Sequence, residues 1–405
     1  MKVLVNFNYS RKQWVSLLLP LFDHFEVHWI RYISKSEDEY QHISSHFYHY
    51  WGEYKDSNQI LSNINPDFCI VMDNKAPLTI ALIYQCKKKG IPVVLLHHGI
   101  VLTVKDMYVL ESNVFDNAEH VSDIKRIKNE KNFNTIKFVF RSLNLRFFHP
   151  RIILFLLLVK IKGPKLAAFL VKDKIRIPTA YLCSSDQNAI NQSELDGNIS
   201  ERLYLIGNPE LDLVVNEYYG IDERSMPVNY WLHIDQPLSG GDLSEKFISE
   251  KDHQSIYKTL SELASSYKAK LYIKLHPGNY SGTNLPVDSN IVWLKEVKNL
   301  TQLIKGAKVC TGFFSNLLLP CIAFRPTILI KLFEISWYTV MGKYHNVEVV
   351  DDIKALFVNG EIPKAPSKSD SFSFLEKQGY TPKQEYSDRF LHTVNSILKK
   401  NRAEY

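Results

Sequence analysis

The residues best suited to chemistry form a Lys-x-His-Pro pattern, Lys274-Leu275-His276-Pro277, at the end of an apolar run. Side chains alternate along a strand, so Lys274 and His276 are expected on the same side of it. A cation beside an imidazole suits an anionic group such as a phosphate or diphosphate. The pattern therefore predicts a phosphate-binding loop in which Pro277 makes the turn rigid.

A second polar loop, residues 311–316, lies between an apolar run and the helical stretch that begins at Leu317. Backbone N–H groups at the start of a helix attract phosphate, and the hydroxyls of Thr311 and Ser315 would add donors. The alternative is that Ser315 is a plain N-cap residue. The residues of this loop that we assign to donor binding are Thr311, Gly312, Ser315 and Asn316.

Two further strand ends carry groups suited to proton transfer or nucleophilic attack. Asp235 follows the apolar run 230–234 and is followed by Gln236, which we assign to donor binding, and by a Gly-rich turn. Asp235 can act as a nucleophile or base, or it can stabilise the loop as an Asx-turn residue. Another run ends in His97-His98-Gly99, where a histidine can act as a general base or bind an anion. We predict Asp235 and His98 as catalytic residues.

Several familiar chemistries have no counterpart in the sequence. There is no P-loop, no GxGxxG after the first predicted strand, no HExxH and no GxSxG. No DxD-type acidic pair follows a predicted strand, so we expect neither a metal nor another cofactor. The five cysteines are far apart and form no CxxC pair, which argues against a zinc knuckle or a disulfide framework and favours a reducing compartment.

The pattern of the 405 residues predicts an α/β protein with parallel sheets, because short β-rich runs alternate with longer helical stretches. The expected strands are Val3–Asn8, Val27–Tyr32, Phe68–Met72, Val93–His97, Ala180–Cys183, Leu203–Ile206, Tyr230–Ile234, Leu271–Leu275, Ile291–Leu294, Lys308–Cys310 and Thr327–Ile330. A polar stretch at 222–227 suits a linker. We place an N-terminal domain at 1–218, a C-terminal domain at 219–385 and a last helix at 386–405 that packs back on the first domain.

Two helices and one loop are predicted in the second half in more detail. One helix places Ile256, Leu260, Leu263 and Tyr267 on its core face. The segment 360–371 is rich in Pro, Ser and Lys and predicts a loop. Ser387 is expected to cap the last helix, whose core stripe is Phe390, Val394, Ile397 and Leu398.

The positive charge of the chain is concentrated in one segment. Residues 125–176 contain 14 Lys and Arg against two acids, although the whole chain carries only +6. Basic residues mixed with apolar ones suit an anionic membrane surface, and the alternative is a core helix with a solvated basic face. No known nucleic-acid motif accompanies the charge, so nucleic acid is not expected as a partner. The longest aliphatic run, 152–159, is too short to span a bilayer and we see no export signal.

The motifs resemble those of bacterial sialyltransferases, polysialyltransferases and β-Kdo transferases, which use CMP-activated 2-ulosonic acids. Lys274-Leu275-His276-Pro277 resembles their His-Pro motif, and the 311–316 loop resembles their serine motif. The resemblance implies that His276 and Ser315 contact the CMP phosphate. It also implies a GT-B fold, in which two Rossmann-like doubly wound domains face each other across a cleft. The motifs that resemble those families lie in the second domain. The first domain is similar to theirs in its architecture alone.

One departure from these families concerns the catalytic base. Sialyltransferases of this kind carry an acidic pair before a glycine at a first-domain strand end, where this chain has His97-His98-Gly99. Retaining β-Kdo transferases place an aspartate nucleophile in the C-terminal domain, so the resemblance makes Asp235 a nucleophile; in an inverting enzyme Asp235 or His98 would be the base.

The resulting expectation is a metal-independent glycosyltransferase that moves an ulosonic sugar, Kdo ahead of sialic acid, from CMP to a surface glycan. The acceptor would be a lipopolysaccharide or capsule glycan or a lipid-linked oligosaccharide, and the protein would be cytoplasmic, at the inner face of the membrane. Three alternatives stay open. They are a CDP-glycerol or CDP-ribitol polyol-phosphate transferase, a sugar-nucleotide epimerase, and a non-catalytic GT-B module.

Overall fold

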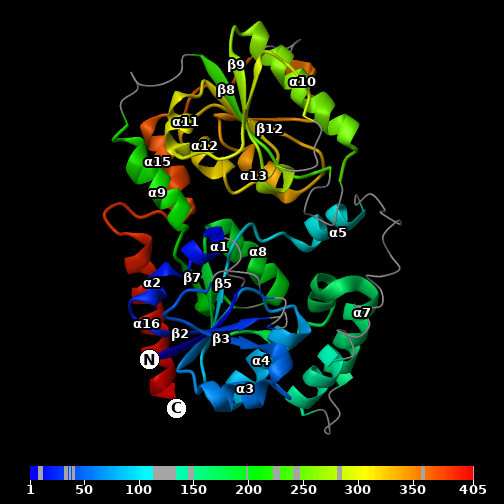
Figure 1. The fold of residues 1–405 in the computed structure, drawn as a ribbon, viewed down its shortest axis with the longest axis vertical. Coiled ribbons are helices and arrows are strands. Elements are labelled where there is room, and N and C mark those ends of the chain that lie inside the picture. Colours follow the sequence, from blue (N-terminus) through cyan, green and yellow to red (C-terminus); the bar gives the residue numbers. More distant parts are fainter. Residues whose placement is uncertain are drawn as a thin grey trace. The chain divides into compact units, whose positions relative to one another are not determined.

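The computed structural model describes residues 1–7, 12–31, 35, 38, 42–112, 134–144, 150–197, 199–221, 229–239, 247–280, 285–356 and 361–404. The chain divides into two compact units (Figure 1). Unit 1 comprises 1–104, 120–210 and 377–405, and unit 2 comprises 105–119 and 211–376. These limits differ from the predicted ones at 218 and 385, and the segment from 105 was not expected in the second unit.

Unit 1 is built on a seven-stranded sheet in the order β3-β2-β1-β4-β5-β6-β7, in which neighbouring strands are parallel. The strands are β1 (Lys2–Asn6), β2 (Glu26–Arg31), β3 (Phe47–Tyr50), β4 (Phe68–Val71), β5 (Val93–Leu96), β6 (Ala180–Cys183) and β7 (Leu203–Leu205). The helices include α1 (Lys12–Ser16), α2 (Leu19–Phe22), α3 (Ser57–Ile64), α4 (Pro77–Lys88), α7 (Pro150–Leu170), α8 (Asp186–Asp196) and α16 (Tyr386–Glu404), with a further helix at 134–142.

Unit 2 is built on a six-stranded parallel sheet in the order β10-β9-β8-β11-β12-β13. The strands are β8 (Tyr230–Ile234), β9 (Lys270–Lys274), β10 (Ile291–Leu294), β11 (Val309–Gly312), β12 (Thr327–Ile330) and β13 (Val347–Val350). The helices include α5 (Val104–Ser112), α9 (Pro209–Tyr218), α10 (Glu250–Ser266), α11 (Leu300–Gly306), α12 (Leu318–Phe324), α13 (Ser336–Met341) and α15 (Lys368–Lys377), with the 3-10 turn η7 (Pro277–Asn279).

The predicted α/β class with two doubly wound parallel sheets is confirmed. Every strand expected from the sequence is present, because the central strands are continuous apolar runs buried on both faces. Some described strand ends differ slightly from the prediction, and the predicted ends at residues 8 and 32 lie outside the described residues. Among the described residues, two strands were not predicted, β3 and β13. Both lie at a sheet edge and contain residues that are half-buried or exposed, and neither is a long apolar run.

The last helix, α16, completes the core of unit 1. Its predicted stripe of Phe390, Val394, Ile397 and Leu398 is buried against apolar residues of β1, β2, β4, β5 and β6, and α16 lies beside α2 (Figure 1). The helix begins at Tyr386, so the prediction of Ser387 as its cap is wrong.

Two local predictions in unit 2 need correction. The helix expected around 256–267 is α10, but Tyr257 and Ala264 line its core with Leu260 and Leu263, whereas Tyr267 is exposed after its last turn. The predicted loop at 360–371 ends earlier, because α15 begins at Lys368.

Among the described residues, no helix has the length and apolar character needed to cross a bilayer.

Candidate functional site

Three of the predicted loops meet at the carboxyl edge of the unit 2 sheet. Strand β8 lies between β9 and β11, and its last residue, Ile234, pairs with Lys274 on one side and Gly312 on the other. The residues that follow these strands therefore start at the same level. Carboxyl edges of parallel sheets are where α/β folds place ligands, so this edge is the candidate site.

Asp235, the first residue after β8, is held inside this edge. Its carboxylate accepts hydrogen bonds from the Tyr257 hydroxyl at 2.8 Å, the Asn279 amide at 2.7 Å and the His276 backbone N–H at 3.3 Å. His253 lies 3.2 Å from the same carboxylate, and the aspartate side chain is fully buried. Its partners lie on α10 and on the loop after β9, so the expected Asx-turn within its own loop is not what holds it.

The charge of Asp235 is stabilised by these neighbours. Burial alone would raise the pKa of the carboxyl, but the hydrogen bond and charge of His253 and the hydrogen bond from Asn279 outweigh it and lower the pKa. Asp235 is therefore ionised inside the protein. A buried carboxylate with this many partners acts here by fixing the loop that contains His276 and Asn279.

His276 is oriented by its own loop. Its Nδ1 accepts the backbone N–H of Gly278 at 3.0 Å and so caps η7. An accepting Nδ1 cannot carry the proton, so a neutral His276 carries it on Nε2. The ring is half-buried, and Pro277 next to it is exposed.

Lys274 ends β9 in a half-buried position. Its Nζ donates to the carbonyl of the next residue, Leu275, at 2.9 Å. Burial lowers the pKa of this lysine, and the charge of Asp235 opposes the shift in part. A partly desolvated ammonium is a strong partner for an anion. The predicted convergence of Lys274 and His276 on one anion stays a prediction.

The loops after β8 and β11 are joined by Gln236. Its side-chain amide exchanges two hydrogen bonds with the backbone of Phe314. Gln236 was predicted as a donor-binding residue, and its amide group is engaged within the protein. It therefore shapes the site by fixing the loop that leads to Ser315.

The residues predicted in the 311–316 loop divide into buried and half-buried ones. The hydroxyl of Thr311 is buried and lies 2.9 Å from His233 Nδ1, which removes it from the loop surface. Gly312 is needed for packing, since a Cβ there would lie 2.9 Å from the methyl groups of Leu318 and 3.0 Å from the Ile234 carbonyl. Ser315 and Asn316 remain half-buried at the edge.

Ser315 is not the N-cap of α12. The cap position is occupied by Leu317, and the Ser315 hydroxyl accepts the N–H of Leu317 at 3.3 Å in the turn before the helix. The alternative reading of Ser315 as a plain N-cap is therefore wrong. The hydroxyl still stands beside the edge, where it can also donate a hydrogen bond.

Beneath the three loops lies a buried network that the sequence analysis missed. His253 contacts the hydroxyls of Ser239 and Tyr257, each at 2.9 Å, and Tyr257 also donates to Asp235. His233 is fully buried, and burial lowers its pKa to about 4, so it is neutral. His253 and Tyr257 are four residues apart on α10, a spacing that puts both on one helix face and was available from the sequence.

His98 belongs to unit 1, after β5. Its half-buried ring packs edge-on against Trp14 and Phe7, with ring centroids 5.0 Å and 5.7 Å away. Aromatic contacts of this kind orient the imidazole. The prediction of His98 as a catalytic residue stays a prediction, because it lies in a different unit from the edge described above.

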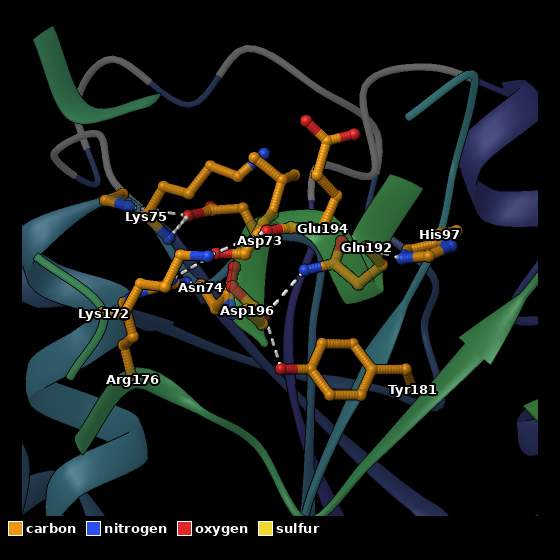
Figure 2. Close-up of polar contacts among 12 residues, drawn as sticks. Asp73, Asn74, Lys75, His97, Lys172, Arg176, Tyr181, Gln192, Glu194 and Asp196 are labelled. Carbon is orange, nitrogen blue, oxygen red and sulfur yellow. Dashed lines mark hydrogen bonds and ion pairs between the residues drawn. The ribbon is translucent and has the colours of Figure 1, made fainter. Parts of the chain in front are cut away.

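His97, the neighbour of His98, is part of a buried polar network (Figure 2). Its Nε2 lies 3.2 Å from Gln192 Oε1, and Gln192 in turn donates to Asp196 at 2.7 Å. Arg176 and Tyr181 also donate to Asp196. Burial lowers the pKa of His97 to about 3 against the effect of the Gln192 bond, so the ring is neutral. The network fixes the end of β5 from which His98 projects.

The structure thus brings nine predicted residues to one sheet edge of unit 2, whereas His98 belongs to unit 1. The nine are Asp235, Gln236, Lys274, His276, Pro277, Thr311, Gly312, Ser315 and Asn316. In the described part of the chain, no group of three or more His, Cys, Asp or Glu side chains is arranged to hold a metal ion.

No protein-family model and no curated protein matches the sequence. Solved structures do. UDP-GlcNAc 2-epimerase of Methanocaldococcus jannaschii, in complex with UDP-GlcNAc and UDP, is similar with a TM-score of 0.52 and 11% identity, over 98% of this chain and 99% of that one. The wall teichoic acid polymerase TagF, in a variant soaked with CDPG, is similar with a TM-score of 0.49 and 11% identity, over 100% of this chain and 90% of that one. A glycosyltransferase of kitacinnamycin has a TM-score of 0.44 and 11% identity, over 99% of this chain and 94% of that one. The likeness to the epimerase and the two parallel sheets together give this chain the GT-B fold.

Proposed function

We propose that this chain is a GT-B glycosyltransferase that takes its sugar from a cytidine nucleotide bound at the edge after β8, β9 and β11. The observation that carries the proposal is the orientation of His276, whose Nδ1 is occupied by Gly278 so that Nε2 holds the donor proton. Lys274 is the last residue of β9, and the half-buried Ser315 lies in the loop after β11; these two strands flank β8. A cation and two neutral donors suit a phosphate.

The finer form of the proposal names the donor as a CMP-activated 2-ulosonic acid, Kdo ahead of sialic acid. The choice of cytidine and of the ulosonic sugar rests on the resemblance of the 274–277 motif to the His-Pro motif of those families. The acceptor is a bacterial surface glycan, of the lipopolysaccharide or capsule type, or a lipid-linked oligosaccharide. The transfer needs no metal in this proposal, and the protein works at the cytoplasmic face of the membrane.

The chain's own residues divide the work as follows. His276 and Lys274 hold the phosphate as it becomes the leaving group and gains negative charge. Asp235 acts through His276 and Asn279 by fixing their loop, since its oxygens are occupied inside the protein. His98 is the base that accepts the proton of the acceptor hydroxyl. This assignment moves Asp235 from the predicted role of nucleophile to that of a positioning residue.

A second candidate is favoured by the burial of Asp235. Transfer of glycerol phosphate or ribitol phosphate from a CDP donor takes place at phosphorus, and a histidine base with a cationic phosphate site is sufficient for it. A retaining sugar transfer needs a carboxylate nucleophile within reach of the anomeric carbon, and Asp235 is fully buried. Both candidates use a cytidine nucleotide and differ in the atom that is attacked.

The experiment is a thermal-shift and calorimetric titration with CMP, CDP, UMP, UDP, GDP and ADP, followed by product analysis with CMP-Kdo, CMP-sialic acid, CDP-glycerol and CDP-ribitol. A ligand that binds the folded state raises the melting temperature. We expect a preference for cytidine nucleotides that is lost in His276→Ala and kept in His345→Ala, a change at a half-exposed histidine of the same unit.

Each outcome distinguishes the candidates. Transfer from a CMP-sugar supports the first, and transfer from a CDP-polyol supports the second. A preference for UDP with conversion of UDP-sugars in the absence of an acceptor overturns both in favour of an epimerase. Binding without turnover of any donor favours a non-catalytic GT-B module.

A further inference from the structure

Helix α7 of unit 1 carries apolar side chains on a face that points into solvent. Leu154, Leu157 and Ile161 are 50%, 55% and 71% exposed. They are three and four residues apart, which places them on one side of the helix. Single exposed apolar residues are common on protein surfaces, but three neighbours on one helix face form a patch that marks an interaction site.

The core does not account for this face. The inner side of α7 is held by Ile152 and Phe155, each 5% exposed, which pack into two apolar clusters of unit 1. A surface helix that packs through one stripe normally carries polar residues on the other side. Here the outer side is apolar as well, so it is suited to a second apolar environment.

The charges around the patch have one sign. Arg151, Lys160 and Lys162 are exposed on α7, and no Asp or Glu occurs between Pro150 and Leu170. Exposed lysines and arginines beside apolar side chains are typical of helices that lie in the headgroup region of an anionic bilayer. We call Leu154, Leu157 and Ile161 with these three cations the apolar–basic face.

The helix cannot continue into the bilayer core. At Gly163 the backbone leaves helical geometry with φ +79° and ψ +162°, and Pro164 follows. The first segment of α7 therefore ends after about three and a half turns, well short of the roughly 20 residues that a spanning helix needs. This geometry suits a helix that lies on a surface.

The neighbouring helix at 134–142 repeats the same composition. Ile136 and Phe140 are exposed, as are Lys137 and Arg141. The two helices are neighbours, because residues 139 and 143 pack with Ile152 of α7 in one apolar cluster. Its four exposed residues fall on successive turns, so it carries an apolar and basic side of its own.

We propose that the apolar–basic face docks unit 1 on the surface of a bilayer that contains anionic lipids. On α7 and the helix at 134–142 this face offers exposed cations around an apolar centre, a combination that matches the anionic headgroups and apolar interior of such a bilayer. The inference narrows the predicted 125–176 surface to α7 with the adjoining helix; residues 125–133 and 145–149 lie outside the described part of the chain. It goes beyond the proposed donor site, which lies in unit 2.

The test is flotation of the full chain with vesicles of phosphatidylcholine alone or mixed with phosphatidylglycerol. We expect binding to the anionic vesicles that weakens in high salt, and little binding to the neutral ones. The triple variant L154S/L157S/I161S should lower the affinity for anionic vesicles at least about tenfold. The double variant K160E/K162E should lower it by at least about tenfold at low salt, with a smaller effect at high salt.

The matched control is Leu213→Ser, which changes a leucine 58% exposed on α9 of unit 2; its vesicle binding should equal that of the wild type. All these side chains are exposed, so the melting temperatures should be unchanged. Equal vesicle binding by the wild type and the triple variant would overturn the proposal, as would no binding of the wild type to anionic vesicles.

A self-associating face would be recognised by gel filtration. If the wild type elutes as a dimer, the triple variant as a monomer, and neither floats with vesicles, then a second copy covers the face and the lipid proposal is wrong. CMP titration of the triple variant separates this result from the function proposed above, because donor binding in unit 2 should be unaffected by changes on α7.

Discussion

The side-chain amide of Gln236 holds the backbone of Phe314 at two points: Nε2 donates to the carbonyl at 2.7 Å, and Oε1 accepts the N–H at 2.9 Å. This pair of bonds replaces a strand ladder just beyond the point where β8 and β11 end. It fixes the distance between the loop that begins with Asp235 and the loop that contains Ser315. The edge on which a nucleotide phosphate is proposed to bind is therefore formed before the ligand arrives.

Replacing Gln236 by Ala should loosen this edge. The variant leaves the N–H and the carbonyl of Phe314 without their partner, so unit 2 should lose roughly 1–3 kcal/mol in urea unfolding. Nucleotide affinity should fall in the same variant if the loop positions matter for binding. Gln254→Ala removes a hydrogen bond to Glu250 at the exposed surface and should change neither quantity. Equal effects of the two substitutions would contradict the role of Gln236.

Asp235→Asn distinguishes a positioning residue from a nucleophile. The amide cannot accept all the hydrogen bonds that the carboxylate accepts, and His253 loses the buried carboxylate beside it, so unit 2 should be destabilised by roughly 2–4 kcal/mol. We expect weaker nucleotide binding together with measurable residual turnover. A nucleophilic aspartate predicts the opposite result, which is unchanged nucleotide binding and no turnover.

His97 should make unit 1 less stable in acid. Its pKa is about 3 in the folded protein and about 6.5 when unfolded. Below pH about 6.5 the His97 ring binds a proton in the unfolded chain but stays neutral in the folded chain. The free energy of unfolding therefore falls as the pH decreases toward 3. The slope from this one group is at most about 1.4 kcal/mol per pH unit.

The measurement is the free energy of unfolding of unit 1 between pH 7 and pH 4, in the wild type and in His97→Gln. The glutamine cannot titrate, so the variant should show a shallower slope even if it is less stable at pH 7. His392→Gln replaces an exposed histidine on α16 and serves as the control. Parallel slopes for wild type and His97→Gln would show that the pKa of His97 is not lowered in the folded state.

Phe390→Ala should unfold unit 1 while sparing unit 2. The ring is fully buried in the core that α16 shares with β1, β2 and β4, and its removal should cost about 3–5 kcal/mol. The nucleotide-induced stabilisation of unit 2 should persist, which a two-step thermal melt in the presence of CMP can follow. A single concerted loss of both transitions would show that unit 2 is not stable without unit 1.

The sequence was sufficient to find the loops of the candidate site because each one follows a continuous apolar strand. Strand ends at one edge of a parallel sheet converge, so Lys274, His276 and Ser315 could be grouped without knowing the strand order. What could not be predicted was which polar side chains point inward. Asp235 and Gln236 have acceptors and donors that suit a ligand equally well, and only the positions of Tyr257, Asn279 and Phe314 show that these groups are already satisfied.

The division into units differs from the predicted limits for a related reason. The segment that begins at Lys105 follows the fifth strand of the first sheet in sequence, yet it belongs to unit 2. Its anchor is Asp106, which accepts hydrogen bonds from the N–H and the hydroxyl of Ser336, more than two hundred positions further along the chain. Periodicity and composition describe local structure, so a contact of this range leaves no trace in them.

The position of α16 in the core of unit 1 sets an order of events during synthesis. The first sheet emerges from the ribosome early, but part of one of its faces stays uncovered until α16 has been made. Residues 211–376 of unit 2 are synthesised before α16. They can fold while the strands of unit 1 are not yet covered by that helix. Premature termination anywhere before Tyr386 would leave a nascent chain with an exposed apolar sheet, which is the kind of surface that chaperones bind.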